Sequence, residues 1–416
     1  MHWWWYLRNN ERGNCQANGV IITALLIRKE LAPLQSFEVE HTPCHLIVDN
    51  DALNATVTAL ADEPVLAVDT EFLRTNTFFP IVGLIQIATH QVCYLIDPVA
   101  CTTLEPLKAV LLDEAKRIVM HSCSEDLEVF LRVFGQVPPQ VFDTQIAASL
   151  VSRDHQLGLQ KLIRSYCGKD IPKDETRSDW TKRPLSESQL TYAALDVVCL
   201  LQVYDALLAR LDALGRTAWC VEECQRLVDA YGVESDNARY YRSIGDAWKL
   251  KGKKLQVLQA LAEWRETVAR ERDKPRGFIF SDKELFAIAD KLPGSTAQLA
   301  EAGNFKPVQV RKYGSEALGI IDTVIKSNAE PLPLLEKPFN NTVKKLTRCI
   351  KPEVEKKAIA LDMATDRLAS RKYLEKYVKA VIEGKDLPGY FQGWRAQALV
   401  PELDAALEQI QSNQPG

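Results

Sequence analysis

The chain has 416 residues, more than one ordinary hydrophobic core holds, so we expect about two to three domains. With 46% hydrophobic and 25% charged residues, its composition is that of a soluble globular protein and excludes a low-complexity chain. The net charge of −4 excludes attraction of a polyanion by overall charge, so nucleic-acid binding would depend on local basic patches and bound cations.

The first forty residues match no domain pattern. Trp3-Trp4-Trp5 is not a positively charged leader, and the apolar stretch Gly19–Ile27 is shorter than the ~18–20 residues that span a membrane. We expect residues 1–43 to be a disordered extension, with a membrane-proximal anchor as the alternative. The ten cysteines include no Cys-x-x-Cys pair, and without a signal-peptide pattern we interpret them as reduced cytosolic thiols. We accordingly expect a cytoplasmic protein with no membrane partner.

The apolar run Val65–Val68 predicts a buried strand, and Asp69-Thr70-Glu71 follows it directly. Because side chains two apart on a strand project from the same face, Asp69 and Glu71 are expected to stand together at the strand's edge. Two like charges this close repel each other, so either one carboxylate is protonated or a cation lies between them.

A second acidic setting begins at the strand predicted over Arg117–Met120, which leads into an amphipathic helix. Ser122 and Glu125 have the spacing of a capping box, so the helix is expected to start there. Asp126 then lies in the first helical turn, where it either only complements the helix dipole or serves as a ligand.

The third setting is a helix introduced by residues 186–189, on which Tyr192 and Asp196 are four apart and share one face. An acid in a stripe otherwise made of Ala, Val, Cys and Leu is costly to bury. Asp196 is therefore either a paired core acid or a ligand in a cleft.

Together the three settings supply the carboxylates of Asp69, Glu71, Asp126 and Asp196. They offer about the charge that two divalent cations require, and hard cations such as Mg²⁺ prefer oxygen ligands. Two such ions about 4 Å apart stabilise the attacking and leaving oxygens of a phosphoryl displacement. A nearby phenol, that of Tyr192, can hold the attacking water in line. The sequence therefore predicts metal-assisted hydrolysis of a phosphodiester.

At these residues the sequence resembles the DEDDy exonucleases, and the ribonuclease D group within them, from about residue 44 onward. Asp69-Thr70-Glu71-Phe72 is similar to the family's first motif, His121-x-Ser-x-Glu-Asp126 to its second, and Tyr192-x-x-x-Asp196 to its third. The resemblance implies that the four acids hold two Mg²⁺ or Mn²⁺ ions and that Tyr192 orients the nucleophilic water. All five residues are intact, which speaks against a non-catalytic scaffold.

Further stretches also resemble this family, namely Gly83–Ile87, Leu95–Pro98, Val141–Gln145 and Arg177–Trp180. The candidate substrate-binding residues are Phe72, Arg74, Gln86 and His121. Phe72 either stacks on a terminal base or fills core space, and Arg74 either reaches a phosphate or forms a surface ion pair. For His121 the alternative is packing at the strand end. Asp143, a fifth acid, is expected either to support the ligands or to be structural, because four ligands already suffice.

In the first domain the sequence pattern indicates strands that alternate with helices. It therefore predicts an α/β sheet with one antiparallel edge. The expected elements after Val65–Val68 are a hairpin of Leu84–Thr89 with Val92–Ile96, a helix over Leu104–Leu112, the strand Arg117–Met120, and an approach to the next helix at Gln140–Phe142. For residues 44–212 the resemblance implies the ribonuclease H-like exonuclease fold.

The rest of the chain predicts helices without strands, starting with a helical linker over residues 213–247. Residues 248–330 resemble a helicase-and-RNase-D C-terminal (HRDC) domain, and residues 331–411 are interpreted as a second such helical domain by analogy. Basic residues crowd both regions, from Lys249 to Arg276 and from Lys344 to Lys357. They either contact phosphates or only form solvated helix faces.

We therefore predict a monomeric 3′–5′ exoribonuclease that trims RNA 3′ ends, with tRNA precursors as substrates and nucleoside 5′-monophosphates as products. A DNA 3′–5′ exonuclease is the first alternative, because the carboxylate motifs serve both sugars and only groups that read the 2′-hydroxyl discriminate. A non-catalytic RNA-binding protein is the second alternative.

Overall fold

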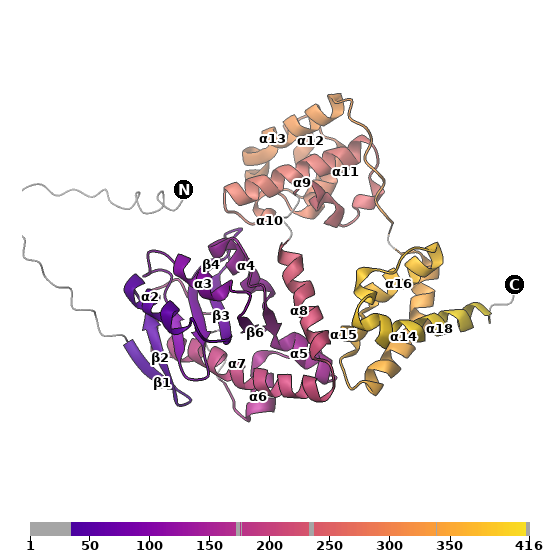
Figure 1. The fold of residues 1–416 in the computed structure, drawn as a ribbon. Helices are drawn as coiled ribbons and strands as arrows, with labels where there is room; N and C mark the ends of the chain where they lie inside the picture. Colours follow the sequence, from indigo (N-terminus) through magenta and orange to yellow (C-terminus); the bar gives the residue numbers. More distant parts are fainter. Residues whose placement is uncertain (1–34, 172–174, 176, 233–236, 338, 413–416) are drawn as a thin grey trace, which may run out of the picture. The chain divides into compact units, whose positions relative to one another are not determined.

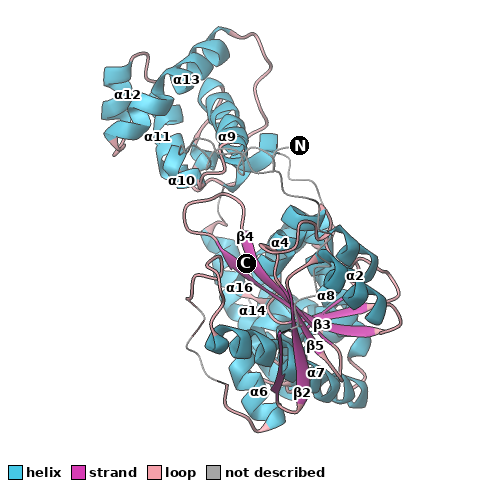
Figure 2. Ribbon diagram, turned by 90° about the vertical axis from the view of Figure 1, so that its left-hand side faces the viewer, coloured by secondary structure: helices cyan, strands magenta, loops and turns pink. Residues whose placement is uncertain are grey.

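The structure is a computed structural model that describes residues 35–171, 175, 177–232, 237–337 and 339–412. Its N-terminal domain is built on one seven-stranded mixed sheet with the order β1-β2-β5-β4-β3-β6-β7 (Figures 1 and 2). The strands are β1 (Gln35–Val39), β2 (Thr42–Ile47), β3 (Val65–Leu73), β4 (Ile81–Ala88), β5 (Cys93–Ile96), β6 (Arg117–Met120) and β7 (Val141–Asp143).

Strand β4 runs antiparallel to both of its neighbours, β3 and β5, while β3, β6 and β7 are parallel to one another. The β4–β5 pair is the predicted hairpin, and β6 has the predicted bounds. We predicted one antiparallel edge, at this hairpin, but β4 and β5 lie inside the sheet, and the antiparallel edge strand is β1, which we did not predict.

Helices cover both faces of the sheet, so the domain has three layers (Figure 1). The helices are α2 (Asn50–Ala59), α3 (Lys108–Leu111), α4 (Ser124–Phe134), α5 (Thr144–Val151), α6 (Leu159–Cys167) and α7 (Glu187–Ala213). Along β3, Leu66 and Val68 pack in the core that includes α4, whereas Ala67 packs in the core that includes α7. Strand alternation therefore directs Asp69 and Glu71 to the α7 face and Thr70 to the α4 face.

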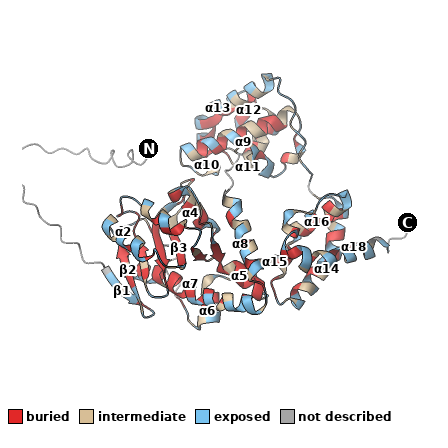
Figure 3. Cartoon of the chain, viewed as in Figure 1, coloured by how far each residue is buried: buried red, intermediate tan, exposed pale blue. Residues whose placement is uncertain are grey.

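Helix α7 is long and apolar enough to qualify as a membrane span by length and composition alone. However, 67% of its most apolar window is buried inside the protein, where it packs on β3, β4 and β5. Figure 3 shows buried residues (red) along the strands of the sheet. Helix α7 is thus the central helix of this domain's core.

After β7 the described part of the chain is helical, as predicted. The elements that follow α7 are α8 (Thr217–Gly232), η2 (Asn237–Ser243), η3 (Ala247–Lys249), α9 (Lys253–Glu271), α10 (Arg276–Ile279), α11 (Asp282–Lys291), α12 (Thr296–Ala302), α13 (Pro307–Lys326), α14 (Asn341–Ala360), α15 (Thr365–Ala369), α16 (Arg371–Glu383), η4 (Gly389–Phe391), α17 (Trp394–Ala398) and α18 (Val400–Ser412). Helices α9 to α13 enclose a hydrophobic core of their own. Helix α11 begins with a capping box between Ser281 and Glu284.

Three expectations need correction. The disordered extension predicted over residues 1–43 is wrong for Gln35–Val39, which form β1 and pair with β2; residues 1–34 lie outside the described residues. Strand β3 does not end at Val68 but continues through both acids to Leu73, because β4 pairs with it along this length. The capping box expected at Ser122 does not form, since Ser122 has a φ of 53° and Cys123 is the N-cap of α4, without a side-chain cap.

Candidate active site

Strand β3 and helix α7 bring three of the predicted acids together. Asp69 and Glu71 project from β3 toward α7, and Asp196 is a buried acid in the middle of α7. One carboxylate oxygen from each of these three residues lies within 4.8 Å of the other two. Of the alternatives that the sequence left open for Asp196, the structure therefore favours a ligand, because its acidic neighbours are other carboxylates.

Asp126, the fourth acid, reaches the same region from the first turn of α4. Its carboxylate is buried and accepts a hydrogen bond of 2.5 Å from the Thr70 hydroxyl. Charge repulsion from Asp126 acts on Glu71, and repulsion from Asp69 acts on Asp126, so the fourth acid shares the electrostatic field of the other three.

Burial raises the pKa of every acid in this group, since a charged carboxylate loses its hydration there. Burial and the charge of Asp196 raise the pKa of Asp69 to about 7, and burial with the charges of Asp69 and Asp196 raises the pKa of Glu71 to about 10. Burial and the charge of Asp69 raise the pKa of Asp126 to about 8, against the hydrogen bond from Thr70. Burial raises the pKa of Asp196 to about 7, although the nearby Tyr192 phenol acts in the opposite direction.

This donor set fits divalent metal ions. All of its ligand atoms are carboxylate oxygens, which hard cations such as Mg²⁺ prefer. The carboxylates repel one another in a desolvated place, and a bound cation removes that repulsion and stabilises their charged forms. No other group of three or more His, Cys, Asp or Glu side chains in the described ranges has a geometry that would hold a metal ion.

Tyr192 stands one helical turn before Asp196 and is buried. Burial, followed by the charges of Asp196, Glu71 and Asp69, raises the pKa of the Tyr192 phenol well above its usual range. The phenol therefore stays neutral, one helical turn from the Asp196 carboxylate.

The candidate substrate-binding residues have different environments. Phe72 is partly buried on β3, whereas Gln86 is fully buried on β4 opposite Asp69, and neither end of its amide has a partner among the described protein atoms. Arg74 forms an ion pair with Glu128 and donates to the Phe78 carbonyl. The ion pair is one of the two alternatives that the sequence left open for Arg74. His121 is partly buried, and its Nδ1 lies 2.9 Å from the Thr144 hydroxyl. Their contacts with substrate stay predictions, and the burial of Gln86 favours a positioning role.

Asp143 is structural, as expected. Its carboxylate caps α5 by accepting from the amides of Gln145 and Ile146. The same carboxylate accepts from the amides of Ser122 and Cys123, at 3.2 and 3.0 Å. Asp143 therefore holds the turn that leads into Asp126, which explains why the local capping box is not needed.

Sequence reasoning missed Thr70 as a positioning residue. The signal was present, because a residue between two acids on a strand must face the opposite side of the sheet. What the sequence does not reveal is that Asp126 lies on that side, 56 positions further along the chain.

A mixed sheet that carries such a carboxylate cluster against a central helix is the architecture of a 3′–5′ exonuclease. Residues 44–212 match the family model described as a 3′-5′ exonuclease, and residues 254–321 match the model of the HRDC domain. The chain belongs to the ribonuclease D family: it is 38% identical to ribonuclease D of Pseudomonas paraeruginosa over 83% of this chain and 93% of that protein. With ribonuclease D of Escherichia coli the identity is 33%, over 88% of this chain and 98% of the relative.

Solved structures agree with this assignment. The crystal structure of Escherichia coli RNase D superposes with a TM-score of 0.79 at 33% identity and covers 88% of this chain and 98% of that one. The catalytic core of RRP6 from Trypanosoma brucei has a TM-score of 0.53 at 25% identity, over 71% of this chain and 83% of its own. The protein is thus an exoribonuclease that acts on RNA with divalent metal, and the two alternative functions are set aside.

Proposed function

We propose that this protein removes nucleotides one at a time from the 3′ end of structured RNA, with tRNA precursors as substrates and nucleoside 5′-monophosphates as products. The observation that carries the proposal is the group of three carboxylates within 4.8 Å of one another, beside Tyr192 and electrostatically coupled to Asp126. The similarity to Escherichia coli RNase D, an exoribonuclease involved in structured RNA processing, supports the substrate class.

In this proposal Asp69, Glu71, Asp126 and Asp196 hold two Mg²⁺ or Mn²⁺ ions. When bound, such a pair supplies charge stabilisation to the attacking and leaving oxygens of the phosphodiester. The neutral Tyr192 phenol, one helical turn before Asp196 on α7, orients the attacking water. Thr70 fixes the orientation of the Asp126 carboxylate from the other face of the sheet. We further propose that the protein works as a monomer in the cytoplasm.

The test uses purified protein with a 5′-labelled RNA that has a single-stranded 3′ tail, and with a DNA copy of it. Mg²⁺, Mn²⁺ and EDTA are compared, with Asp126→Asn as the inactive control. A ladder that shortens from the 3′ end on RNA and needs metal supports the proposal, and chromatography identifies the released nucleotide. Equal trimming of DNA, or trimming that persists in Asp126→Asn, contradicts it.

A tRNA precursor with a 3′ trailer tests the natural substrate. The expected result is trimming that stops near the mature 3′ end, whereas an unstructured RNA of the same length is degraded further. Light scattering on the same preparation measures the mass, which is expected to be near the 46.8 kDa of one chain.

A further inference from the structure

The segment between α6 and α7 packs on an irregularity of β4 that lies next to the acidic cluster. In the β3–β4 ladder Glu71 pairs with Leu84, but Phe72 pairs with Val82, so Gly83 is an extra residue in β4. Such a bulge bends the strand and re-aims the neighbouring side chains, and bulges are frequent next to active sites. Here the bulge lies directly opposite Glu71.

Gly83 is required by the close approach of Trp180. A side chain begun at Gly83 would place its Cβ 2.6 Å from the Trp180 carbonyl oxygen and 2.7 Å from the Trp180 Cβ. Trp180 itself is 2% exposed, and its ring centroid lies 6.2 Å from that of Tyr192. The indole N–H has no acceptor among the described protein atoms. Packing and the backbone, not a hydrogen bond of the indole, therefore hold the Trp180 ring beside Tyr192.

The guanidinium of Arg183 joins the three segments that meet here. It binds Asp97 through two hydrogen bonds of 2.6 Å, from Nε to Oδ2 and from Nη2 to Oδ1. The same group donates to the Gly83 carbonyl at 2.7 Å and to the Trp180 carbonyl at 2.8 Å. Only the planar fork of an arginine can make this set of bonds, because a lysine ammonium has no bidentate geometry.

Asp97, which binds the Arg183 guanidinium, is itself held in place by the backbone. Its carboxylate is buried directly after β5, and it also accepts from the amides of Val99 and Ala100. Two of the stretches that resemble the family lie outside the acidic motifs. They contain Ile96-Asp97-Pro98 and Asp179-Trp180, and they meet here.

We propose that Asp97, Arg183, Trp180 and Gly83 form a clasp that positions Tyr192 for catalysis. This rests on the proposed function, in which Tyr192 orients the attacking water. The four are positioning residues, since none of them belongs to the acidic cluster and they reach Tyr192 through the Trp180 ring. A displacement of about 1 Å at a reacting group costs up to about 10²-fold in rate. Loosening the clasp is therefore expected to lower kcat and to leave KM almost unchanged.

The experiment is a double-mutant cycle between Arg183→Lys and Tyr192→Phe, with kcat and KM measured on 3′-tailed RNA. Arg183→Lys keeps the charge and loses the fork, and we expect kcat to fall about tenfold with KM within about twofold of wild type. In the Tyr192→Phe background the same change is expected to have almost no further effect, because the clasp acts through Tyr192. A merely structural role would lower kcat by the same factor in both backgrounds, and that result would overturn the proposal.

A variant that fails to fold would also lose activity, so thermal unfolding is measured for every variant. Two further variants test the clasp at other residues. Trp180→Phe keeps a ring in place and Gly83→Ala pushes Trp180 away, so both are expected to show the same dependence on Tyr192. Arg164→Lys is the matched control, because Arg164 forms an exposed pair with Asp170 and its substitution should leave kcat unchanged.

If Tyr192→Phe itself has wild-type kcat, the proposed role of Tyr192 is wrong and the clasp has no catalytic role. If Tyr192→Phe is impaired and Arg183→Lys is not, the clasp alone is wrong.

Discussion

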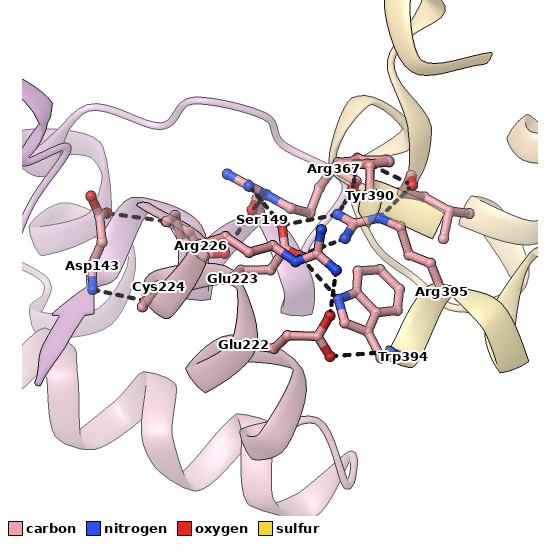
Figure 4. A network of polar contacts seen from close by, with 12 residues as sticks. Asp143, Ser149, Glu222, Glu223, Cys224, Arg226, Arg367, Tyr390, Trp394 and Arg395 are labelled. Atoms are coloured by element: carbon pink, nitrogen blue, oxygen red, sulfur yellow. Dashed lines mark hydrogen bonds and ion pairs between the residues drawn. The ribbon is translucent and has the colours of Figure 1, made fainter. Parts of the chain in front are cut away.

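Both oxygens of the Glu223 carboxylate bind the guanidinium of Arg395, at 2.5 and 2.9 Å (Figure 4). Arg395 is 0% exposed and Glu223 5% exposed, so the pair is removed from water. Trp394 and Arg367 also bind this carboxylate, at 3.2 and 3.3 Å. The pair connects α8 with the helices that begin at α14. Cys224, the next residue on α8, accepts from the backbone of Asp143, which in turn holds the turn before Asp126.

We predict that Glu223→Gln strongly destabilises the protein. The substitution leaves the buried Arg395 guanidinium without its counter-charge, and breaking one side of a buried pair costs about 3–5 kcal/mol. Urea unfolding followed by tryptophan fluorescence is a suitable measurement, because Trp219 and Trp394 stack at 4.4 Å in the same place. The matched control is Asp322→Asn, which breaks an exposed pair with Lys326 and should cost below about 1 kcal/mol. Equal losses in the two variants would contradict the prediction.

The contribution of Glu223 is expected to depend on pH. Burial raises the pKa of Glu223, but the hydrogen bonds and charges of Arg395 and Arg367 outweigh burial, so the pKa is lowered overall. The unfolded chain then binds the proton more readily than the folded protein does. The stabilisation by Glu223 is therefore fully present above its unfolded pKa of ~4.3, and it is lost as pH falls through its lower pKa in the folded protein. The difference in urea midpoint between wild type and Glu223→Gln should therefore be constant from about pH 7 to 5 and shrink below about pH 4. A difference that stays constant down to about pH 3 would argue against this.

A second connection joins the segment after β3 to the helices that match the HRDC model. The Asp273 carboxylate accepts from the amides of Phe78 and Phe79, at 2.9 and 3.0 Å. The Phe78 ring belongs to the core of α9 to α13, with the guanidinium groups of Arg270 and Arg276 each 4.8 Å from its centre. The loop that follows Asp69 and Glu71 is therefore fixed by the helical domain.

We predict that Asp273→Ala releases this loop. Two partly buried amides would lose their acceptor, at a cost of about 1–3 kcal/mol, and Ala fits poorly at the φ of 46° that Asp273 adopts. Hydrogen exchange measured by mass spectrometry should become faster over residues 75–80. Asp273→Asn is the control, because Asn tolerates this φ and keeps one oxygen acceptor, so its exchange should stay close to that of wild type. Slow exchange in both variants would show that the Phe78 ring alone holds the loop.

Local pattern was enough to predict much of the fold. The alternation in Val65–Glu71 placed both acids on one face, and an apolar run predicted the bounds of β6. Errors arose where a distant partner decides the structure. The run after Val68 has no apolar pattern of its own, and it is a strand because β4 pairs with it.

The same distinction applies to the site. Asp69, Glu71, Asp126, Tyr192 and Asp196 were predicted as site residues from the sequence, since each stands in a recognisable local setting. Their supports were not, because each joins residues far apart in the chain: Asp143 reaches the turn at Ser122, and Arg183 reaches Asp97, 86 positions away. Contacts between residues so far apart have no characteristic spacing in the sequence, so a single sequence does not predict them.

The hydrogen bond from Thr70 to Asp126 leads to the last prediction. Thr70→Val keeps the shape of the side chain and removes the donor, so the Asp126 carboxylate loses the group that fixes its orientation. Loss of a hydrogen bond that supports a metal ligand typically costs about 10–100-fold in metal affinity or activity. The expected result is that exonuclease activity on 3′-tailed RNA needs correspondingly more Mg²⁺, and that kcat stays reduced at saturation. Thr70→Ser, which retains the hydroxyl, should behave like wild type. If Thr70→Val has the Mg²⁺ dependence of Thr70→Ser, the hydrogen bond has no part in holding Asp126.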